Sequence, residues 1–263
     1  MAIACEPDAL KIATWNVNSL KVRLQHVLDW LAMNEPDVLA LQETKLTDDA
    51  FPAQAFADAG YRVVYSGQKT YNGVAVVARE QPVEVVTDPP GVESEQRRIL
   101  ATTVGGVRVV NLYVVNGLEV DSDKYRFKLD WLAAVTAWLR VEIERYPRMV
   151  VLGDFNIAPA DADVHDPQEW RDRILCSGPE RAALSRMLEL GLADCFRRFE
   201  QPENSFSWWD YRAAGFRRNR GLRIDLILAS NPLLDGCRSC LIDVEPRRLE
   251  RPSDHAPVVA EFA

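Results

Sequence analysis

The tetrad Ser253-Asp254-His255-Ala256 places one of the three histidines of the chain beside a carboxylate, just before the apolar run 257–262. Three earlier segments repeat this arrangement, with an apolar run followed by amide or acidic side chains. They are 15–18 (Trp-Asn-Val-Asn), 42–44 (Gln-Glu-Thr) and 153–156 (Gly-Asp-Phe-Asn). Carboxylates and amides offer the oxygen ligands that Mg²⁺ prefers, and a bound metal polarises a phosphoryl oxygen. These side chains together indicate metal-assisted chemistry on a phosphate.

The spacing inside these segments suggests which side chains act together. Asp154 and Asn156 are two residues apart, so an extended backbone would point both side chains to one face; the same holds for Asn16 and Asn18. Asp225 lies within the apolar run 222–228, where an unpaired carboxylate would be costly. We therefore expect Asp225 to contact His255, because a carboxylate fixes the tautomer of an imidazole and supports its charged form.

Each of these patterns also has a plainer explanation. Asn-x-Asn and Asp-x-Asn after a strand are common turn sequences, and an Asp-His pair before a strand can be structural. Glu43 could be a solvated strand end. His26 lies in a predicted helix and is expected at the surface, whereas His165 follows the Asp154 segment and could lie at the rim of a site. Four such segments in one chain favour chemistry over four unrelated turns.

The distribution of charge and aromatic residues bears on the substrate. The net charge is −8, but between Asp210 and Arg223 five arginines face a single acid, a local balance of 5 − 1 = +4. A basic stripe on an acidic body can follow a phosphate backbone. The aromatic segment 206–211 (Phe-Ser-Trp-Trp-Asp-Tyr) directly precedes it, and rings beside cations suit stacking on unpaired bases. A solvated arginine loop and rings packed in the core are the alternatives. No glycine-rich phosphate loop is present, which argues against nucleoside triphosphate chemistry.

The elements that must position these residues follow from periodicity. Apolar residues at helical spacing between Leu20 and Leu31 predict a helix that Ser19 can cap. Further helices are expected over 124–146 and from Pro179 to Gly191. Strands are expected at 12–14, 38–41, 73–78, 98–104, 107–115, 149–152, 222–229 and 257–262, with Gly105-Gly106 as a hairpin turn. Hairpins mixed with helical crossovers predict sandwiched mixed sheets flanked by helices.

The composition fits an ordinary globular enzyme, with 48% hydrophobic and 27% charged residues. No linker divides the chain, so we expect one domain over 1–263, of which 1–9 is a flexible N-terminal extension. No apolar run approaches the roughly 20 residues needed to span a bilayer, and no signal peptide is recognisable. We therefore expect a cytoplasmic protein. Its five cysteines, at positions 5, 176, 195, 237 and 240, are expected to be reduced. The Cys237-x-x-Cys240 pair lacks the second pair of ligands that a zinc site needs.

Motifs spread along nearly the whole chain resemble those of one known family. In order, they are 13–19 (Ala-Thr-Trp-Asn-Val-Asn-Ser), 41–45 (Leu-Gln-Glu-Thr-Lys), 67–73 (Gly-Gln-Lys-Thr-Tyr-Asn-Gly), 112–113 (Leu-Tyr), 153–159 (Gly-Asp-Phe-Asn-Ile-Ala-Pro), 206–208 (Phe-Ser-Trp), 219–225 (Asn-Arg-Gly-Leu-Arg-Ile-Asp) and 253–258 (Ser-Asp-His-Ala-Pro-Val). The chain resembles the exonuclease III / AP endonuclease family of the endonuclease/exonuclease/phosphatase superfamily. The resemblance implies an α/β (α+β) fold, a four-layer αββα sandwich of two packed mixed β-sheets flanked by helices, with the site at one edge of the sheets.

The same resemblance implies roles for individual residues. The implied catalytic residues are Tyr113, Asp154, Asn156, Asp225 and His255. The implied metal ligands are Asn16, Glu43, Asp154, Asn156, Asp254 and His255, with Glu43 as the principal one. The implied DNA-binding residues are Asn18, Asn116, Trp208, Asn219, Arg217, Arg218 and Arg220. In this scheme Asp154 orients water or transfers a proton, and His255, oriented by Asp225, binds the phosphate.

The function implied is that of a DNA repair nuclease using one or two Mg²⁺ ions, with Mn²⁺ as a substitute. It would cleave duplex DNA on the 5′ side of abasic sites, remove 3′ blocking groups and act as a 3′→5′ exonuclease. We expect a monomer in the bacterial cytosol or nucleoid. The alternatives are a phosphatase of the same superfamily acting on small phosphoesters, a DNA-binding protein with an inactive site, and a thiol oxidoreductase using Cys237 and Cys240.

Overall fold

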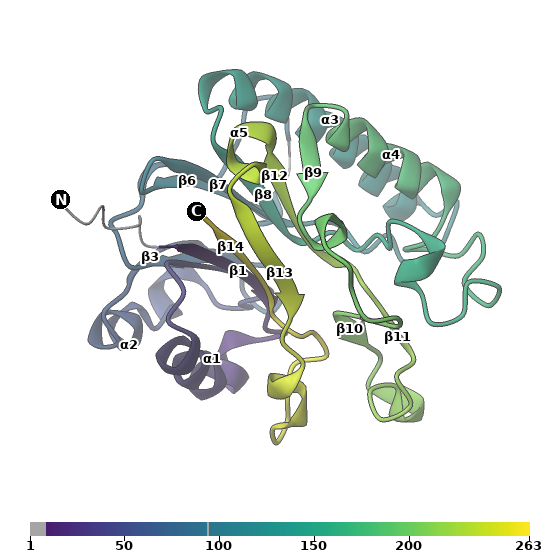
Figure 1. Ribbon diagram of the computed structural model, residues 1–263, viewed down its shortest axis with the longest axis horizontal. Helices are drawn as coiled ribbons and strands as arrows, with labels where there is room; N and C mark the ends of the chain where they lie inside the picture. The colour runs from purple at the N-terminus through teal and green to yellow at the C-terminus, as the bar shows by residue number, and fades with distance from the viewer. Residues whose placement is uncertain (1–8, 94) are drawn as a thin grey trace, which may run out of the picture.

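The computed structural model describes residues 9–93 and 95–263, in which two six-stranded mixed sheets pack face to face (Figure 1). Residues 1–8, which include Cys5 and most of the expected N-terminal extension, lie outside the described residues. The first sheet contains, in spatial order, β13 (Cys237–Ile242), β14 (Val258–Phe262), β1 (Leu10–Asn16), β2 (Val38–Gln42), β4 (Val74–Ala78) and β3 (Arg62–Ser66). The second contains β5 (Val83–Val86), β6 (Ile99–Val104), β7 (Val107–Tyr113), β8 (Met149–Asp154), β12 (Asp225–Ser230) and β9 (Leu192–Asp194). A separate two-stranded ladder pairs β10 (Trp208–Trp209) with β11 (Gly221–Leu222).

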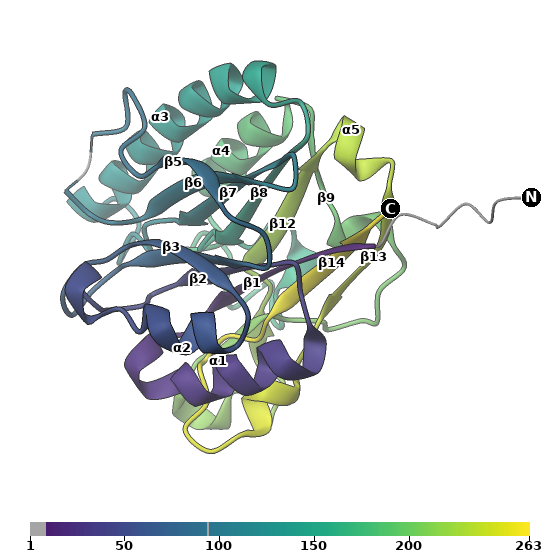
Figure 2. The same ribbon diagram turned by 90° about the vertical axis from the view of Figure 1, so that its left-hand side faces the viewer.

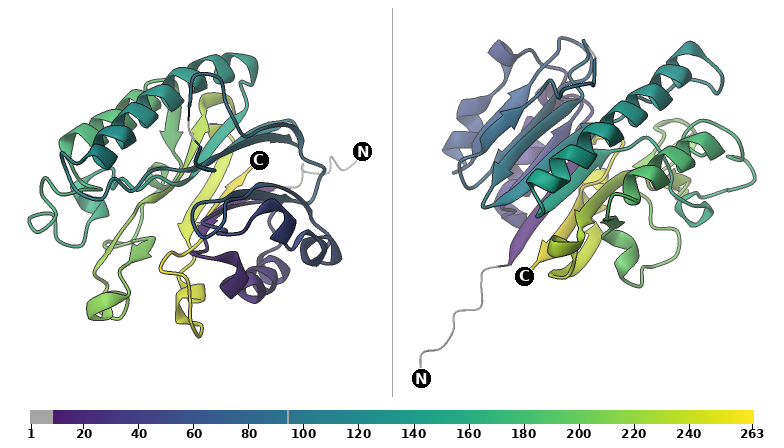
Figure 3. Two further views of the ribbon diagram at one scale, coloured as in Figure 1. Left: turned by 180° about the vertical axis from the view of Figure 1, so that it is seen from behind. Right: turned by 90° about the horizontal axis from the view of Figure 1, so that it is seen from above.

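Helices cover the outer face of each sheet, which gives the predicted αββα order of layers (Figure 2). The first sheet is covered by α1 (Leu20–Asn34) and α2 (Ala53–Asp58), and the second by α3 (Asp123–Arg145) and α4 (Gly178–Leu188). The remaining helices are short: α5 (Asn231–Leu234) and the 3₁₀ turns η1 (Asp48–Ala50), η2 (Asp161–Asp163), η3 (Phe196–Arg198), η4 (Arg212–Ala214) and η5 (Glu245–Arg248). Figure 3 shows the same layers from behind and from above.

Three apolar cores separate the four layers, and strand β1 shows how one sequence serves two of them. Ile12 faces the core between the sheets, whereas Ala13 and Trp15 face the core beneath α1. This alternation is the two-residue period of a strand. Both faces of the central strands are covered, which explains why β2 and β4 are buried along their whole length.

Each sheet contains one parallel pair at its centre, joined by a crossover helix. In the first sheet β1 and β2 are parallel, with Asn16 opposite Gln42; in the second β7 and β8 are parallel, with Tyr113 opposite Asp154. The other strand pairs are antiparallel. Parallel strands end at the same edge of a sheet. The polar residues at the carboxyl ends of each parallel pair therefore lie next to each other.

A buried amide bridge joins the two sheets behind that edge. Gln42 Nε2 donates to Asn111 Oδ1 at 2.8 Å and to Thr14 Oγ1 at 2.9 Å, and Asn111 Nδ2 donates to the carbonyls of Leu41 and Ala75 at 2.9 Å. Polar groups buried in this way favour one packing arrangement, because any other leaves them unpaired. The bridge therefore specifies how the first sheet sits on the second.

Most predicted elements are confirmed, including the Gly105-Gly106 hairpin and the helices α1, α3 and α4. Two details differ. Ser19 is the N-cap residue of α1, as predicted, but its side chain makes no capping bond; its backbone amide donates to the Glu43 carbonyl at 2.7 Å. The segment 222–229 is not one strand, because Arg223 and Ile224 separate β11 from β12. In the part of the chain that the structure describes, no helix is long and apolar enough to cross a membrane.

Candidate active site

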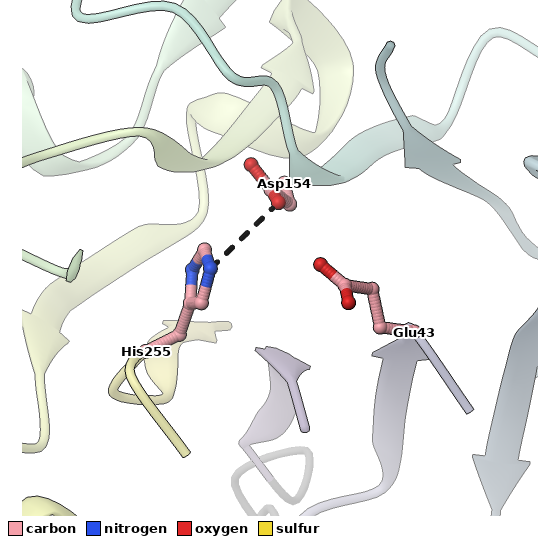
Figure 4. A group of neighbouring side chains, drawn as sticks. All are labelled: Glu43, Asp154 and His255. Atoms are coloured by element: carbon pink, nitrogen blue, oxygen red, sulfur yellow. Dashed lines mark ion pairs between the residues drawn. The ribbon is translucent and has the colours of Figure 1, made fainter. Parts of the chain in front are cut away.

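Glu43, Asp154 and His255 form a compact group at the edge where the two parallel pairs end (Figure 4). Each offers one ligand atom, and these atoms all lie within 4.8 Å of one another. Glu43 follows β2, Asp154 ends β8, and His255 precedes β14. The group therefore draws on both sheets and unites three of the four segments that the sequence singled out. The fourth contributes Asn16, whose Nδ2 donates to Glu43 Oε1 and Asp154 Oδ2, each at 2.9 Å.

Glu43 is held by contacts from three elements. Its Oε1 also accepts from the Tyr113 hydroxyl at 2.9 Å, and its Oε2 lies 2.8 Å from Lys45 Nζ. Burial alone would raise the pKa of Glu43, but Lys45 and the Asn16 amide outweigh it and lower the pKa below the usual value. Burial and the charge of Glu43 raise the pKa of Tyr113 well above its usual value, so the tyrosine stays a neutral hydrogen-bond donor. The Arg98 guanidinium lies 4.4 Å from the Tyr113 ring centroid.

Asp154 is the most deeply buried acid of the group, with 1% of its surface exposed. Its Oδ1 accepts from the Asn156 backbone amide at 2.9 Å and its Oδ2 from Asn156 Nδ2 at 3.1 Å. Burial raises the pKa of Asp154 to about 7, against the lowering effect of His255. Gly153 precedes Asp154 and lies opposite Leu112. A side chain cannot be accommodated there, because a Cβ atom would lie 1.9 Å from the Leu112 carbonyl oxygen.

His255 contacts Asp225 as predicted. Its Nδ1 lies 2.9 Å from Asp225 Oδ2, and its Nε2 lies 3.9 Å from Asp154 Oδ2. Asp225 is also held by Ser207, whose hydroxyl donates to Oδ2 at 2.7 Å. Burial by itself would lower the pKa of His255, but Asp225 and Asp154 raise it to about 10. The imidazole is therefore a cation whose Nε2 edge faces the carboxylate group.

The pairs Asn16/Asn18 and Asp154/Asn156 do not have the extended backbone that would point both side chains to one face. Asn18 and Asn156 have φ values of 42° and 49°, in the left-handed region. In each pair the first side chain accepts a bond from the second backbone amide, at 2.9 Å from Asn18 N to Asn16 Oδ1. These are Asx turns, which Asn tolerates well. The turn explanation is therefore confirmed. It is compatible with the catalytic one, which stays a prediction, since the turns place the amides beside Asp154.

Asp254 lies beside the central group and is engaged by two predicted DNA-binding residues. Its Oδ1 accepts from Asn18 Nδ2 at 2.9 Å and its Oδ2 from Trp208 Nε1 at 3.0 Å. Asn18 Oδ1 also accepts from Lys45 Nζ. Asp254 thereby connects the half-buried Trp208 ring to the loop that carries Asn16. Its role as a metal ligand stays a prediction.

Asn116 joins the site through Asn156, since its Nδ2 donates to Asn156 Oδ1 at 3.1 Å. The backbone carbonyls of both residues accept from Lys128, a fully buried lysine of α3 that our sequence interpretation missed. The signal was present, because Lys128 occupies the same helical face as the buried Trp131 and Val135.

The expected arginine stripe is only partly available to a ligand. Arg217 and Arg218 are exposed, as expected for DNA contact. Arg223, counted in the stripe, is buried and pairs with Asp163 at 2.6 Å and Asp194 at 2.7 Å.

Three other predicted residues of this region are already engaged within the protein. Arg220 is held by Glu169 at 2.6 Å and by His165 Nε2 at 3.3 Å. His165 accordingly lies next to β11, where its Nδ1 is 3.1 Å from the Gly221 carbonyl. Both amide atoms of Asn219 are also engaged, with Trp209 and the Asn204 carbonyl.

The four described cysteines, Cys176, Cys195, Cys237 and Cys240, are free and buried. Burial raises the pKa of Cys176 to about 12 and that of Cys240 well above its usual value. These two thiols are poor nucleophiles at neutral pH, whereas a hydrogen bond with Cys195 lowers the pKa of Cys237. Because Cys240 keeps its proton, the Cys237-x-x-Cys240 pair gives the thiol oxidoreductase alternative little support.

The central group is suited to a divalent metal ion. Glu43 and Asp154 present carboxylate oxygens that converge on one region, the donor type that hard cations select. Asn16 points its NH₂ group at these carboxylates and its Oδ1 at Asn18 N, so it orients the two acids. The imidazole is less suited to a hard cation than to an anion, because its pKa is raised.

Comparison with known proteins shows which family this fold and sequence match. The model of the Endonuclease/Exonuclease/phosphatase family matches residues 13–255. Exodeoxyribonuclease III of Haemophilus influenzae is 36% identical, and the match covers 96% of this chain and all of the relative. A Neisseria 3′ phosphatase, NExo, solved with a product DNA hairpin, superposes with a TM-score of 0.95 at 50% identity and covers 97% of this chain and 99% of its own. An AP endonuclease of Archaeoglobus fulgidus gives 0.90 at 41% identity, covering 96% and 99%.

Proposed function

The chain belongs to the exonuclease III / AP endonuclease group of the Endonuclease/Exonuclease/phosphatase family and is a metal-dependent DNA repair nuclease, and we propose that its metal is Mg²⁺ and its substrate is damaged duplex DNA. It hydrolyses the phosphodiester on the 5′ side of abasic sites and removes 3′ blocking groups, with 3′→5′ exonuclease action. The observation that carries this proposal is the group formed by Glu43, Asp154 and His255, with Asp225 behind the imidazole.

The metal belongs at Glu43 and Asp154, where it would supply charge neutralisation at the phosphoryl oxygens. Mn²⁺ offers the same coordination chemistry and should substitute. The remaining work falls to the side chains. The His255 imidazolium, held by Asp225, binds a non-bridging phosphate oxygen and stabilises negative charge there. Asp154 orients a water molecule and accepts its proton as the water oxygen attacks phosphorus. The bond from phosphorus to the 3′ oxygen breaks, which leaves a 3′-hydroxyl and a 5′-phosphate.

The amides complete the polar environment of the phosphate. Asn156 Nδ2 donates to Asp154 Oδ2 and to the Val114 carbonyl, each at 3.1 Å. Asn116 Nδ2 donates to Asn156 Oδ1 and keeps a second N–H that a phosphate oxygen can accept. Tyr113 keeps its proton and fixes Glu43. Trp208 and the exposed Arg217 and Arg218 extend the site toward the nucleic acid, where a ring stacks and cations contact phosphates.

Side-by-side cleavage assays test this function. The substrates are a duplex with one abasic site, a duplex with a 3′-phosphate and an undamaged duplex, each with Mg²⁺ or with a chelator. The relatives are described as a 3′ phosphatase, a 3′–5′ exonuclease and an AP endonuclease, so the three substrates measure how this chain divides its activity. Failure to cleave all three in the presence of Mg²⁺ or Mn²⁺ would refute the proposal.

A small-phosphoester phosphatase of the same family is the nearest rival. It needs no extended DNA-binding surface, whereas this chain has a half-buried tryptophan fixed to Asp254 and two exposed arginines on the same segment. Efficient hydrolysis of a soluble phosphate monoester, without cleavage of the duplexes, would favour the rival.

A further inference from the structure

Lys128 of α3 is a buried cation with no exposed surface. Its Nζ donates to the carbonyl of Asn156 at 2.7 Å, to the carbonyl of Asn116 at 3.2 Å and to the Glu180 carboxylate. These partners use all three donors of an ammonium group. The lysine thus contacts the backbone of the two residues whose amides connect Asp154 to the phosphate site.

The Glu180 carboxylate is itself immobilised. It occupies the third position of α4 in a capping box with Ser177, whose backbone amide and hydroxyl donate to Oε2 at 3.1 Å and 2.6 Å. The Leu175 amide donates to Oε1 at 3.1 Å. Glu180 therefore holds the Lys128 ammonium in place from helix α4.

Stability alone does not explain this pair. A buried ion pair carries a large desolvation cost, and replacing it by apolar residues of similar volume is often neutral or stabilising. Burial lowers the pKa of Lys128, against the opposing charge of Glu180. The surrounding face of α3 is apolar, with Trp131 and Val135 also buried. An apolar side chain would fill this position, but it would leave both carbonyls without a donor.

The two carbonyls belong to segments that contain residues with positive φ values. Asn156 has a left-handed backbone, with φ of 49°. Gly117, next to Asn116, has φ of 99°, and a Cβ atom there would lie 3.2 Å from Lys128 Cδ. The loop after β7 and the turn after β8 thus close over the same lysine, and their amides meet at 3.1 Å on the other side.

We propose that Lys128 is a positioning residue: its ammonium holds the carbonyls of Asn116 and Asn156, so that Asn156 supports Asp154 and Asn116 turns its remaining N–H to the scissile phosphate. This inference rests on the proposed function and names a residue through which that site is organised. Lys128 itself contacts neither substrate nor metal. Its loss should lower kcat and leave duplex binding, which depends on the exposed arginines, largely unchanged.

The test is the double variant Lys128→Met/Glu180→Leu, because it removes both charges together. Its melting temperature should fall, because the Leu175 and Ser177 amides lose their acceptor, so cleavage is measured at a temperature at which the variant is folded. Its KM for the cleaved duplex should change little. Its kcat should fall about 10- to 100-fold, as for other residues that orient active-site groups from behind. A second double variant, Lys128→Gln/Glu180→Gln, retains NH donors at position 128 and should recover part of the lost kcat.

A matched control exists at the opposite end of β7. Arg108 and Glu142 form another buried pair, joined at 2.6 Å, with 1% and 11% of their side chains exposed. The variant Arg108→Met/Glu142→Leu should keep its kcat whatever its melting temperature. Wild-type kcat in a folded Lys128→Met/Glu180→Leu protein would overturn the positioning role. Absence of cleavage by the wild type would instead refute the proposed function, so the two failures are distinguishable.

Discussion

Asp225 and His255 come from different sheets, yet Asp225 Oδ2 lies 2.9 Å from His255 Nδ1. Asp225 is the first residue of β12 in the second sheet, and His255 precedes β14 in the first. The Ser207 hydroxyl secures the carboxylate from a third segment. The neighbour of His255 in sequence, Asp254, faces Trp208 and Asn18 instead. The sandwich, and not the chain order, therefore decides which acid sets the charge of the imidazole.

The Asp225→Asn substitution should lower the pKa of His255 from about 10 toward its usual value, because the largest favourable charge is lost. NMR titration of the metal-free protein measures this, and the other two histidines, His26 and His165, serve as internal references. Cleavage near neutral pH should fall at the same time. An unchanged titration of His255 in this variant would contradict the assigned pairing.

The same raised pKa predicts how stability depends on pH. The folded-state pKa of His255 lies above its unfolded value of 6.5, so the folded protein binds the proton more tightly. The resulting stabilisation is fully present below about pH 6.5 and is lost as pH rises through about 10. Denaturant unfolding of the metal-free wild type and of His255→Asn should therefore show a difference that shrinks between these limits. A difference that grows with pH would contradict the prediction.

The Asp154→Asn substitution should abolish most cleavage and preserve binding. General acid–base catalysis contributes roughly 10²- to 10⁴-fold, so kcat should fall by at least about a hundredfold. Asn is nearly isosteric with Asp and keeps a side-chain oxygen that can accept from the Asn156 backbone amide, as Asp154 Oδ1 does at 2.9 Å in the wild type. Binding of an abasic duplex, measured by fluorescence anisotropy, should stay within a few-fold of the wild type. The His255→Asn substitution should behave likewise.

Metal binding should stabilise the fold through Glu43. A ligand that binds only the folded state adds about 2.7 kcal/mol at a hundredfold excess over its Kd. Mg²⁺ should raise the melting temperature of the wild type, and Glu43→Gln should remove most of that rise together with cleavage. Chelation should stop cleavage reversibly. A Glu43→Gln variant with the full Mg²⁺ shift would place the metal elsewhere.

The arginines of the segment 210–223 should separate into two classes. Arg217→Ala and Arg218→Ala should each weaken duplex binding and reduce the salt dependence, by about 0.9 in the slope of log K against log salt for each lost phosphate contact. Arg223→Met should instead lower stability, because Asp163 and Asp194 lose their buried partner. Equal salt slopes in all three variants would contradict this division.

Site residues could be predicted from the sequence where a local pattern or a charge in an apolar segment marks them. The Asp225–His255 pair was predictable, because a carboxylate inside an apolar strand needs a partner. Tyr113 and Asn116 carry no such signal and were reached only through the family resemblance. Arg223 was misread as surface charge, since nothing in the local sequence announces that Asp163 and Asp194 converge on it. Lys128 was missed because a lysine on a helix is usually solvated at its tip.

The Asx turns mark a different limit. The two-residue spacing of Asn16 and Asn18 indicated that the two residues are coupled. They are coupled through a left-handed turn at Asn18 and not through an extended backbone. A local side-chain bond to the backbone competes with the extended form and prevails here.

The division of the site between two sheets makes cleavage depend on the docking of one sheet on the other. A chain in which only the first sheet has formed holds Glu43 without Asp154, and one in which only the second has formed holds Asp154 without His255. Neither half-molecule can cut DNA. Recovery of cleavage during refolding should therefore report the docking of one sheet on the other, across the interface that the Gln42–Asn111 hydrogen bond spans.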